Sequence, residues 1–451
     1  MPEKSILFFG AGTSAFLKVP TTEKQNNFFR VFFFDENKEI INYINKEYAV
    51  LDQKDIDQLL QLKVKMKETV GFVKDMFLKK SFKVMDLYNL IDMSVSENRG
   101  FITKNNDKYY VSNITEIRNN ILTILQVLFG ILENNILKNK QNDFLKLKDF
   151  FKSIAEIEIS KRRNQLIGGT IDLQSKEFLF TDIGYVNTNW DVFILWAMLL
   201  AHKELNNENK NYIPDKCGIA KLKVFNDFFT YLNSMDINES SNKDWFPYNQ
   251  AVAYRINDVS HISDRRIILF PTYFPHGQTH WLECPICGKL TMYIDKNFQT
   301  YSFNFAMHKI EKLKCSHCYN DLELSNSSML LQTNYKVKSP YIEEIQRSMR
   351  IAINECDKLI FIGYSLPQDD IEYSSIFRIS SYHTKKVYLV LYKEGCFNEF
   401  ISAQEAKKSC SNTEIEKIIQ RYCDIFEEDL IMVNLSGFPA SMSEILKIIK
   451  Q

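Results

Sequence analysis

The chain has 451 residues, and its 56 Lys and Arg balance its 56 Asp and Glu, so the formal net charge at pH 7 is zero. A balanced charge removes the broad positive field that nucleic-acid-binding proteins use, and direct nucleic-acid binding is not expected. Hydrophobic residues make up 45% of the chain and charged residues 25%, which excludes a disordered chain or a coiled coil.

The length favours one large decorated domain or two packed units. The longest apolar run, residues 192–201, is about half of the roughly 20 residues that span a bilayer, so it predicts a buried helix. The apolar stretch after Lys4 is interpreted as a strand rather than as a signal peptide. Nine cysteines, four of them in two Cys-x-x-Cys pairs, suit a reducing compartment, and the expected location is the cytoplasm.

Residues 4–12, KSILFFGAG, predict a short buried strand that enters a glycine turn, with a helix after Thr13 and Ser14. Gly10 and Gly12 would let the backbone approach a phosphate, whose charge the start of the helix favours. Gly-Ala-Gly is also common in tight turns that bind nothing. The position after the first strand favours the binding interpretation.

Residues 36–162 predict a helical insertion, because apolar residues recur at helical spacing in its long segments. Asn113 and Glu116 predict a capping box for the second long helix. The insertion is either a lid that packs over the sheet or an interface for an oligomer or partner that switches activity. Its length favours the interface.

Strand patterns return at residues 176–186, and Asn189 and Asp191 follow. Ligands of open α/β sheets bind at the carboxyl ends of strands, and an asparagine amide can orient a water molecule or bind a ribose oxygen. Both residue types also serve as helix N-caps. The sequence leaves the two roles equally open.

His276 precedes Gly277 shortly after the strand predicted at residues 265–270. An imidazole titrates near neutral pH and can take a proton from a ribose hydroxyl. The alternative is a buried, hydrogen-bonded histidine of the core. His280 and His317 are nearby competitors for a functional role.

Cys284, Cys287, Cys315 and Cys318 form two Cys-x-x-Cys pairs. Each pair can chelate from a tight turn, and four thiolates complete a closed tetrahedral shell, so the pattern predicts a structural zinc site. The 27 residues between the pairs exceed the usual spacing of about 15 to 20, and a loop there tolerates extra length.

Residues 341–451 alternate between amphipathic helices and apolar strands, and one strand ends in GYSLPQDD, where Gly363 and Ser365 can present donors to a phosphate or ribose. Apolar strands separated by helices predict a parallel sheet covered on both faces. The expected fold is α/β, a Rossmann-like doubly wound parallel sheet with a large helical insertion and a small four-cysteine zinc module. The expected parts are the sheet domain (1–35, 163–283 and 331–451), the insertion (36–162) and the zinc module (284–330).

Five motifs, in the order in which they occur, resemble those of the sirtuin (silent information regulator) family, whose members consume NAD. They are GAGTS, TNWD, HG, the paired Cys-x-x-Cys motifs and GYSL. The resemblance spans both ends of the chain and leaves out only the helical insertion. It implies an NAD site in which the glycine loops hold NAD, the middle motif lies at the nicotinamide end and the histidine is the general base. The matching residues are Gly10, Ala11, Gly12 and Ser14 for the first loop, Gly363 and Ser365 for the second, Asn189 and Asp191 for the middle motif, and His276 for the base.

HGQTHWLECPICG, followed later by CDKLIFIGYSLPQDD, is more similar to bacterial sirtuin-like proteins of antiphage defence than to protein deacetylases. That resemblance implies an NAD hydrolase that forms nicotinamide and ADP-ribose when infection is sensed. It also implies a protein that acts alone or with a HerA-like DNA translocase or a short Argonaute. A homo-oligomer, formed through the helical insertion, is expected as well.

Two departures from the deacetylases bear on the reaction: the Asp-Phe-Arg segment after the first glycine loop is missing, and Thr188 stands where they carry Gln. The first puts deacylation in doubt. A protein deacylase or ADP-ribosyltransferase that uses NAD is the alternative enzyme. A subunit that binds NAD or ADP-ribose without turnover is the alternative from another class.

Overall fold

The structure is a computed structural model. The residues that it describes are 3–17, 19, 22–48, 53–103, 107–172, 176–207, 212–213, 218–225, 265–279, 281–288, 290–292, 313–315, 318, 320–322, 328–331, 333, 337–367, 370–383, 385–410 and 413–451.

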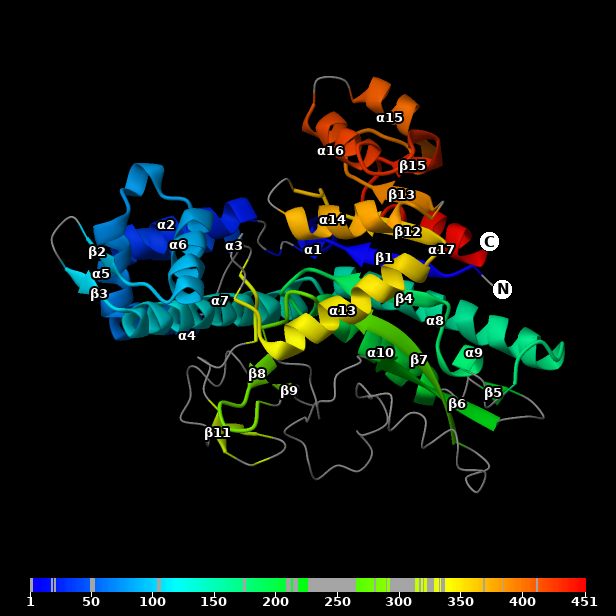
Figure 1. Ribbon diagram of the computed structural model, residues 1–451, viewed down its shortest axis with the longest axis horizontal. Helices are drawn as coiled ribbons and strands as arrows, with labels where there is room; N and C mark the ends of the chain where they lie inside the picture. The colour runs from blue at the N-terminus through cyan, green and yellow to red at the C-terminus, as the bar shows by residue number, and fades with distance from the viewer. Residues whose placement is uncertain are drawn as a thin grey trace.

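A nine-stranded sheet organises the chain (Figure 1). Neighbouring strands run parallel except at the two edges, where β14 and β5 are antiparallel to their neighbours. The expected doubly wound parallel sheet is therefore confirmed, with an antiparallel strand at each edge. In spatial order the strands are β14 (Phe400–Ser402), β15 (Ile431–Asn434), β13 (Lys386–Val390), β12 (Lys358–Ile362), β1 (Ser5–Phe9), β4 (Ile183–Asn187), β7 (Arg265–Tyr273), β6 (Gly218–Phe225) and β5 (Tyr212–Ile213).

Both faces of the sheet are covered, and β1 shows why its sequence is apolar throughout. Leu7 and Phe9 belong to one hydrophobic core, whereas Ile6 and Phe8 belong to the other, because successive side chains of a strand point to opposite faces. The first core contains side chains of α8 (Gln141–Ile167), α10 (Phe193–Asn207) and α17 (Met442–Lys450). The second contains side chains of α13 (Pro340–Glu355), α14 (Ile371–Ser380), α15 (Ala403–Ser409) and α16 (Glu414–Cys423).

The direction of the winding reverses at β1. The chain leaves β1 to build β4, β6 and β7 on one side, and later returns to place β12 on the other side of β1. In doubly wound sheets, ligands bind outside the carboxyl ends of the strands at such a switch point. In this chain the switch point lies between Gly10, which follows β1, and Gly363, which follows β12.

The described parts of residues 22–110 form a helical lobe beside the sheet (Figure 1). The long helix α7 (Val111–Asn139) runs from this lobe toward the sheet, and the predicted end of the insertion at residue 162 lies within α8. Before α7 the chain forms α1 (Ala11–Ser14), the 3-10 turn η1 (Ala15–Leu17), α2 (Thr22–Phe34), α3 (Asn37–Tyr48), α4 (Gln53–Lys65), α5 (Lys67–Met76), the 3-10 turn η2 (Lys79–Ser81), α6 (Val84–Glu97) and a small hairpin of β2 (Phe101–Ile102) and β3 (Lys108–Tyr109).

Two local predictions were wrong. Helix α7 begins at Val111, and the side chain of Asn113 accepts from the backbone N–H of Tyr110 at 3.1 Å, so Asn113 is the third helical residue and not the N-cap. Residues 176–179 form α9 (Lys176–Leu179) rather than the start of a strand. A short apolar run such as Phe178 and Leu179 fits a buried helical turn as well as a strand.

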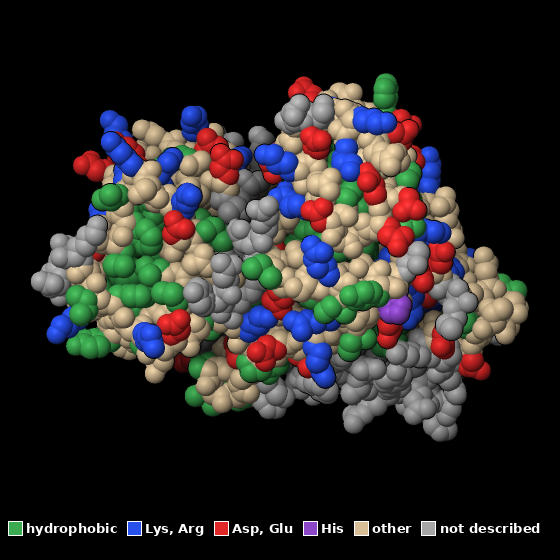
Figure 2. All heavy atoms as spheres, turned by 45° about the horizontal axis from the view of Figure 1, so that its top comes forward, with side chains coloured by type: hydrophobic (Ala, Val, Ile, Leu, Met, Phe, Trp, Pro, Cys, Tyr) green, Lys and Arg blue, Asp and Glu red, His purple; other side chains and the backbone are tan. Residues whose placement is uncertain are grey.

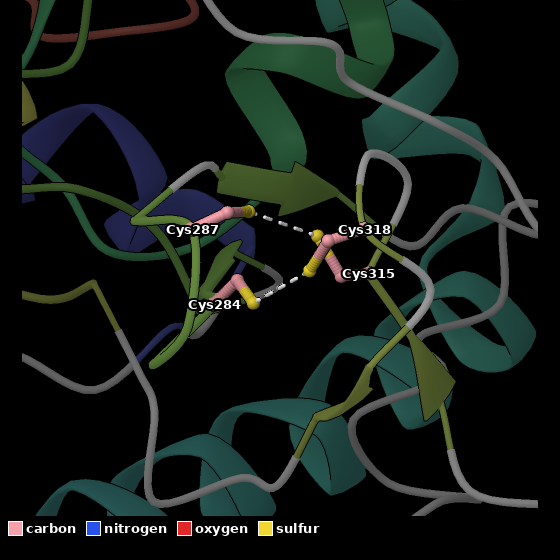
Figure 3. A group of neighbouring side chains, drawn as sticks. All are labelled: Cys284, Cys287, Cys315 and Cys318. Carbon is pink, nitrogen blue, oxygen red and sulfur yellow. Dashed lines mark hydrogen bonds between the residues drawn. The ribbon is translucent and has the colours of Figure 1, made fainter.

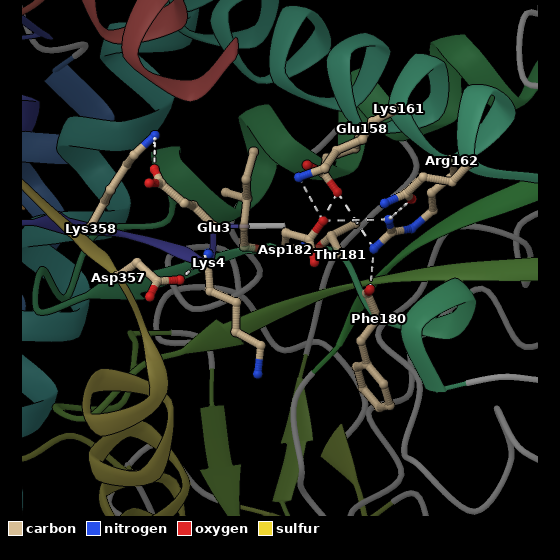
Figure 4. A network of polar contacts seen from close by, with 12 residues as sticks. Glu3, Lys4, Glu158, Lys161, Arg162, Phe180, Thr181, Asp182, Asp357 and Lys358 are labelled. Carbon is tan, nitrogen blue, oxygen red and sulfur yellow. Dashed lines mark hydrogen bonds and ion pairs between the residues drawn. The ribbon is translucent and has the colours of Figure 1, made fainter. Parts of the chain in front are cut away.

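The amino end of the sheet is fixed by buried charges (Figure 4). Arg162 of α8 is fully buried, lies 3.6 Å from Glu158 and 3.8 Å from Asp182, and donates to the carbonyl oxygen of Phe180. Buried charges need such partners, because an unpaired one is strongly destabilising. This network joins α8 to the start of β4. It therefore lies at the amino ends of the strands, whereas the switch point lies at their carboxyl ends.

Among the described residues, no helix combines the length and the apolar character that crossing a bilayer requires. The apolar run at 192–201 instead forms most of α10, which is buried against the sheet, as its sequence predicted.

Candidate active site

The two glycine turns at the switch point pack backbone against backbone. The N–H of Gly12 donates to the carbonyl oxygen of Gly363 at 2.9 Å, and the hydroxyl of Thr13 donates to the carbonyl oxygen of Ile362 at 2.6 Å. Gly363 has a φ of 62°, and a Cβ built on it would lie 2.3 Å from the Thr13 nitrogen. A Cβ on Gly12 would lie 2.8 Å from the Cα of Gly363. Contact between the turns therefore explains both glycines, while Ala11 and Gly12 stay exposed to solvent.

The end of β4 is joined to the first glycine turn. Both the N–H and the hydroxyl of Thr188 donate to the carbonyl oxygen of Phe9, at 3.1 and 3.0 Å. The side-chain amide of Asn189 donates to the carbonyl oxygen of Gly10 at 3.0 Å and to the hydroxyl of Ser14 at 3.3 Å. Asn189 is buried, so its amide has replaced water by these two partners.

Asp191 bonds to the start of α10 and to the first glycine turn. Its Oδ1 accepts from the N–H of Phe193 at 3.1 Å, at the start of α10, and its carboxylate also accepts from Ser14. Asp191 is 1% exposed, and burial raises the pKa of its carboxyl to about 6. Ser14, Asn189 and Asp191 therefore meet in one polar group beside the first glycine turn.

His276 joins this group through the backbone of Thr188. Its Nδ1 lies 2.9 Å from the carbonyl oxygen of Thr188, and its Nε2 lies 2.9 Å from the hydroxyl of Tyr373. A carbonyl can only accept a hydrogen bond, so Nδ1 carries a proton, and in the neutral imidazole Nε2 accepts from the tyrosine. The side chain is 1% exposed, and in the neutral form of this imidazole the basic lone pair lies on Nε2.

The loop that carries His276 is held on several sides. Gly277 has a φ of 68°, and a Cβ there would lie 1.9 Å from the carbonyl oxygen of Ser328. The N–H of Leu330 donates to the carbonyl oxygen of His276 at 2.8 Å, and the indole N–H of Trp190 donates to that of Leu330 at 3.1 Å. These contacts fix the imidazole relative to the Asn189 loop.

Ser365 follows the second glycine turn but is not part of the polar group. It is half-buried, and its hydroxyl makes no hydrogen bond to another described residue. The next residue, Leu366, is buried with a φ of 47°, a conformation that costs a bulky side chain about 1–2 kcal/mol. Strain of this kind is typical of loops whose shape serves a ligand.

Glu133 was missed by the sequence analysis. It lies on α7, is fully buried, and its Oε1 accepts from the N–H of Val192 at 3.3 Å. Burial, together with the charge of Asp191, raises the pKa of Glu133 well above its usual value. Further along α7, the amide of Gln126 donates to the carbonyl oxygen of Thr279 at 2.9 Å. Helix α7 therefore touches both loops that carry the predicted catalytic residues.

The only sequence signal for Glu133 is a lone carboxylate that ends the apolar run at residues 127–132. Tyr373 had no signal, because nothing in its local sequence points to a histidine 97 residues away. The competitors His280 and His317 lie outside the described residues.

The four predicted zinc ligands form one cluster (Figure 3). Their Sγ atoms all lie within 4.8 Å of one another, with 3.4 Å between Cys284 and Cys318 and 3.6 Å between Cys287 and Cys315. Tetrahedral zinc with bonds of about 2.3 Å separates its sulfurs by about 3.8 Å, so this donor set fits zinc. The cysteines lie beside two small hairpins, β8 (Trp281–Glu283) with β9 (Leu290–Met292), and β10 (Leu313–Lys314) with β11 (Asp321–Leu322).

The pKa of one thiol in the cluster, that of Cys318, is lowered, which favours its thiolate form. The backbone N–H of Asn320, and then its side-chain amide at 3.1 Å, bond to the sulfur of Cys318 and lower the pKa of that thiol to about 6. Strand β8 begins five residues after His276, and Trp281 packs edge-on against Phe274 with ring centroids 5.5 Å apart. A metal bound here would therefore stiffen the loop that carries His276.

No family model matches this chain, and no curated protein matches it. Solved structures do match, and two of them are Sir2 homologues in complex with ADP-ribose, one a histidine-to-asparagine mutant and one a serine-to-alanine mutant. Each is 9% identical to this chain, with 99% of this chain and 92% of the other covered and a TM-score of 0.32. At that TM-score the likeness decides neither fold nor activity, and the fold rests on the strand order described above.

Proposed function

We propose that this chain is an NAD hydrolase that cleaves NAD to nicotinamide and ADP-ribose. The observation that supports this best is the meeting of three strand ends at the switch point, where Asn189 bonds to Gly10 and Ser14 while His276 bonds to Thr188. A dinucleotide needs phosphate-binding backbone beside polar groups that bond its ribose, and the carboxyl ends of these strands bring both kinds of group together.

In the proposed reaction the bond between C1′ of the ribose and nicotinamide breaks, and its electron pair leaves with nicotinamide. The oxygen of a water molecule bonds to C1′, and the proton that it loses passes to Nε2 of His276. Asn189 orients the ribose or the water through its amide. The carboxylate of Asp191, which is buried in the same group, stabilises the positive charge that develops on the ribose.

Water is preferred over an acyl-lysine as the second reactant, because His276 is 1% exposed and Tyr373 occupies its Nε2. A lysine side chain with its acyl group is much larger than water and would need more room than the surroundings of this buried histidine leave. A protein deacylase or ADP-ribosyltransferase remains the alternative that the experiment has to separate.

The test incubates purified protein with NAD, alone and with an acetyl-lysine peptide, and quantifies nicotinamide, ADP-ribose and acetylated products. We expect nicotinamide and ADP-ribose in equal amounts without any peptide. Nicotinamide release that requires the peptide would identify a deacylase instead. Tight binding of NAD that stays intact, with every partner tested, would identify a subunit without turnover.

We further propose that the four cysteines hold a structural zinc ion and that the enzyme is an antiphage effector restrained until infection. The helical lobe is the proposed interface for a second copy or for an activating partner, such as a HerA-like DNA translocase or a short Argonaute. Figure 2 shows hydrophobic side chains on the surface of this lobe, where Val64, Leu78, Ile102 and Tyr110 are each at least 66% exposed.

Size-exclusion chromatography combined with NAD consumption, before and after addition of each candidate partner, tests this regulation. When the activating partner is added, we expect the protein to elute as a larger assembly and to consume NAD faster. Phage protection that persists in an Asn189→Ala variant would contradict the effector role.

A further inference from the structure

Tyr373 lies against the one nitrogen of His276 that can act as a base. It comes from α14 rather than from a strand end, and it is fully buried. Its hydroxyl lies 2.9 Å from Nε2, and because Nδ1 already donates to Thr188, the tyrosine is the donor to the neutral imidazole in this contact. Nε2 has a single lone pair, so it can accept from Tyr373 or from a substrate hydroxyl, but not from both.

The tyrosine is held by its ring and by its helix. The ring packs edge-on against Phe8, with centroids 5.8 Å apart, and burial raises the pKa of Tyr373 well above its usual value, which keeps the hydroxyl a neutral donor. The preceding residue, Glu372, pairs with Lys338 of the segment before α13 at 2.8 Å and with Arg350 of α13 at 2.7 Å. Arg350 is about half exposed, so the outer anchor of α14 is open to solvent and to a partner.

We propose that Tyr373 is a positioning residue that caps Nε2 of His276, so that the substrate hydroxyl or water must displace the tyrosine hydroxyl before the imidazole can accept a proton. This inference rests on the proposed NAD hydrolysis and adds a restraint built into the site itself. A shift of α14 that moves the tyrosine hydroxyl away from Nε2 would free this nitrogen for the substrate.

The test is Tyr373→Phe, which removes the hydroxyl and keeps the aromatic packing. We expect the basal rate of NAD hydrolysis, without any activator, to rise about fivefold with a lower KM, as loss of one competing hydrogen bond implies. The matched control is Tyr88→Phe in the helical lobe. Tyr88 is equally buried, and its hydroxyl has no hydrogen-bond partner among the described residues, so its removal should leave the rate unchanged.

A second readout does not depend on turnover. It uses NMR of protein labelled with 15N at its histidines, in which the His276 signals are assigned by their loss in His276→Gln. We expect the wild type to carry a proton on Nδ1 of His276. In Tyr373→Phe we expect the Nε2 signal to shift. An unchanged Nε2 signal, or a rate equal to or below that of the wild type, would overturn the cap. If neither protein hydrolyses NAD, even with every candidate partner added, the proposed function fails, and the Nε2 signal still decides whether Tyr373 caps His276.

Discussion

Asn189 joins two neighbouring strand ends, because its side-chain amide at the end of β4 donates to the carbonyl oxygen of Gly10 at the end of β1, 3.0 Å away. The same amide reaches the hydroxyl of Ser14 at 3.3 Å. One side chain therefore sets both the shape of the first glycine turn and the polar group beside it.

Replacing Asn189 by alanine should lower the kcat for NAD hydrolysis on the order of 10²- to 10⁴-fold, the usual size of such assistance. It should also destabilise the fold by about 1–3 kcal/mol, because it removes two buried hydrogen bonds. Asn206→Ala is the matched control, since this buried amide bonds to the backbone carbonyl oxygen and N–H of Leu222 on β6. The control should lose similar stability and keep its kcat; equal activity losses in both variants would contradict the role of Asn189.

The sheet could be predicted because its strands carry uninterrupted apolar residues that end in glycine or in small polar residues, as at Gly10 and Gly363. The edge strand β14 and the helix α15 were not predicted. The strand has three half-buried residues, which is too short a stretch for a period-two pattern to be recognised. Helix α15 has seven residues and buries Ala403 and Ala406, which give a weak apolar signal.

The candidate site was predicted where its residues lie at strand ends and was missed where they lie on helices. Asn189, Asp191 and His276 follow strands, so sheet topology alone brings them to one edge. Glu133 and Tyr373 reach the same place from α7 and α14. Their positions depend on how those helices pack, which local sequence does not encode.

Asp191 should make stability depend on pH in a specific direction. Its pKa is about 6 in the folded protein against 3.8 for a free aspartate, so the folded state binds more protons between about pH 4 and pH 6. The free energy of unfolding should therefore fall as the pH rises through this window, by on the order of 3 kcal/mol. Asp191→Asn should flatten this part of the curve in urea titrations at several pH values, and an unchanged slope would contradict the burial of the carboxyl.

Gly363→Ala should separate the two glycine turns. A Cβ at a φ of 62° is strained, and it would lie 2.3 Å from the Thr13 nitrogen, so we expect a loss of more than about 2 kcal/mol in denaturant unfolding. Gly71→Ala in α5 is the matched control, because a Cβ there meets nothing within 4 Å. In a helix interior it should stabilise by up to about 1 kcal/mol. Equal stabilities of the two variants would show that the turns do not depend on this contact.

Cys284→Ser should abolish zinc binding and lower the melting temperature, because a structural metal contributes directly to folding. Wild-type protein should contain one zinc ion per chain by elemental analysis and lose it slowly to a chelator. Cys410→Ser, which replaces a buried cysteine outside the cluster, should keep its zinc. Wild-type protein that remains free of zinc after growth and purification with added zinc would rule the metal site out.

The most direct test of the account is a crystal structure of the chain with ADP-ribose, supported by binding titrations of the same protein. We expect the diphosphate beside the Gly10–Gly12 and Gly363 turns, with ribose hydroxyls within hydrogen-bond distance of Asn189 and of Nε2 of His276. ADP-ribose bound at another surface, with Asn189 and His276 unchanged in their contacts, would contradict the claim that these strand ends form the NAD site.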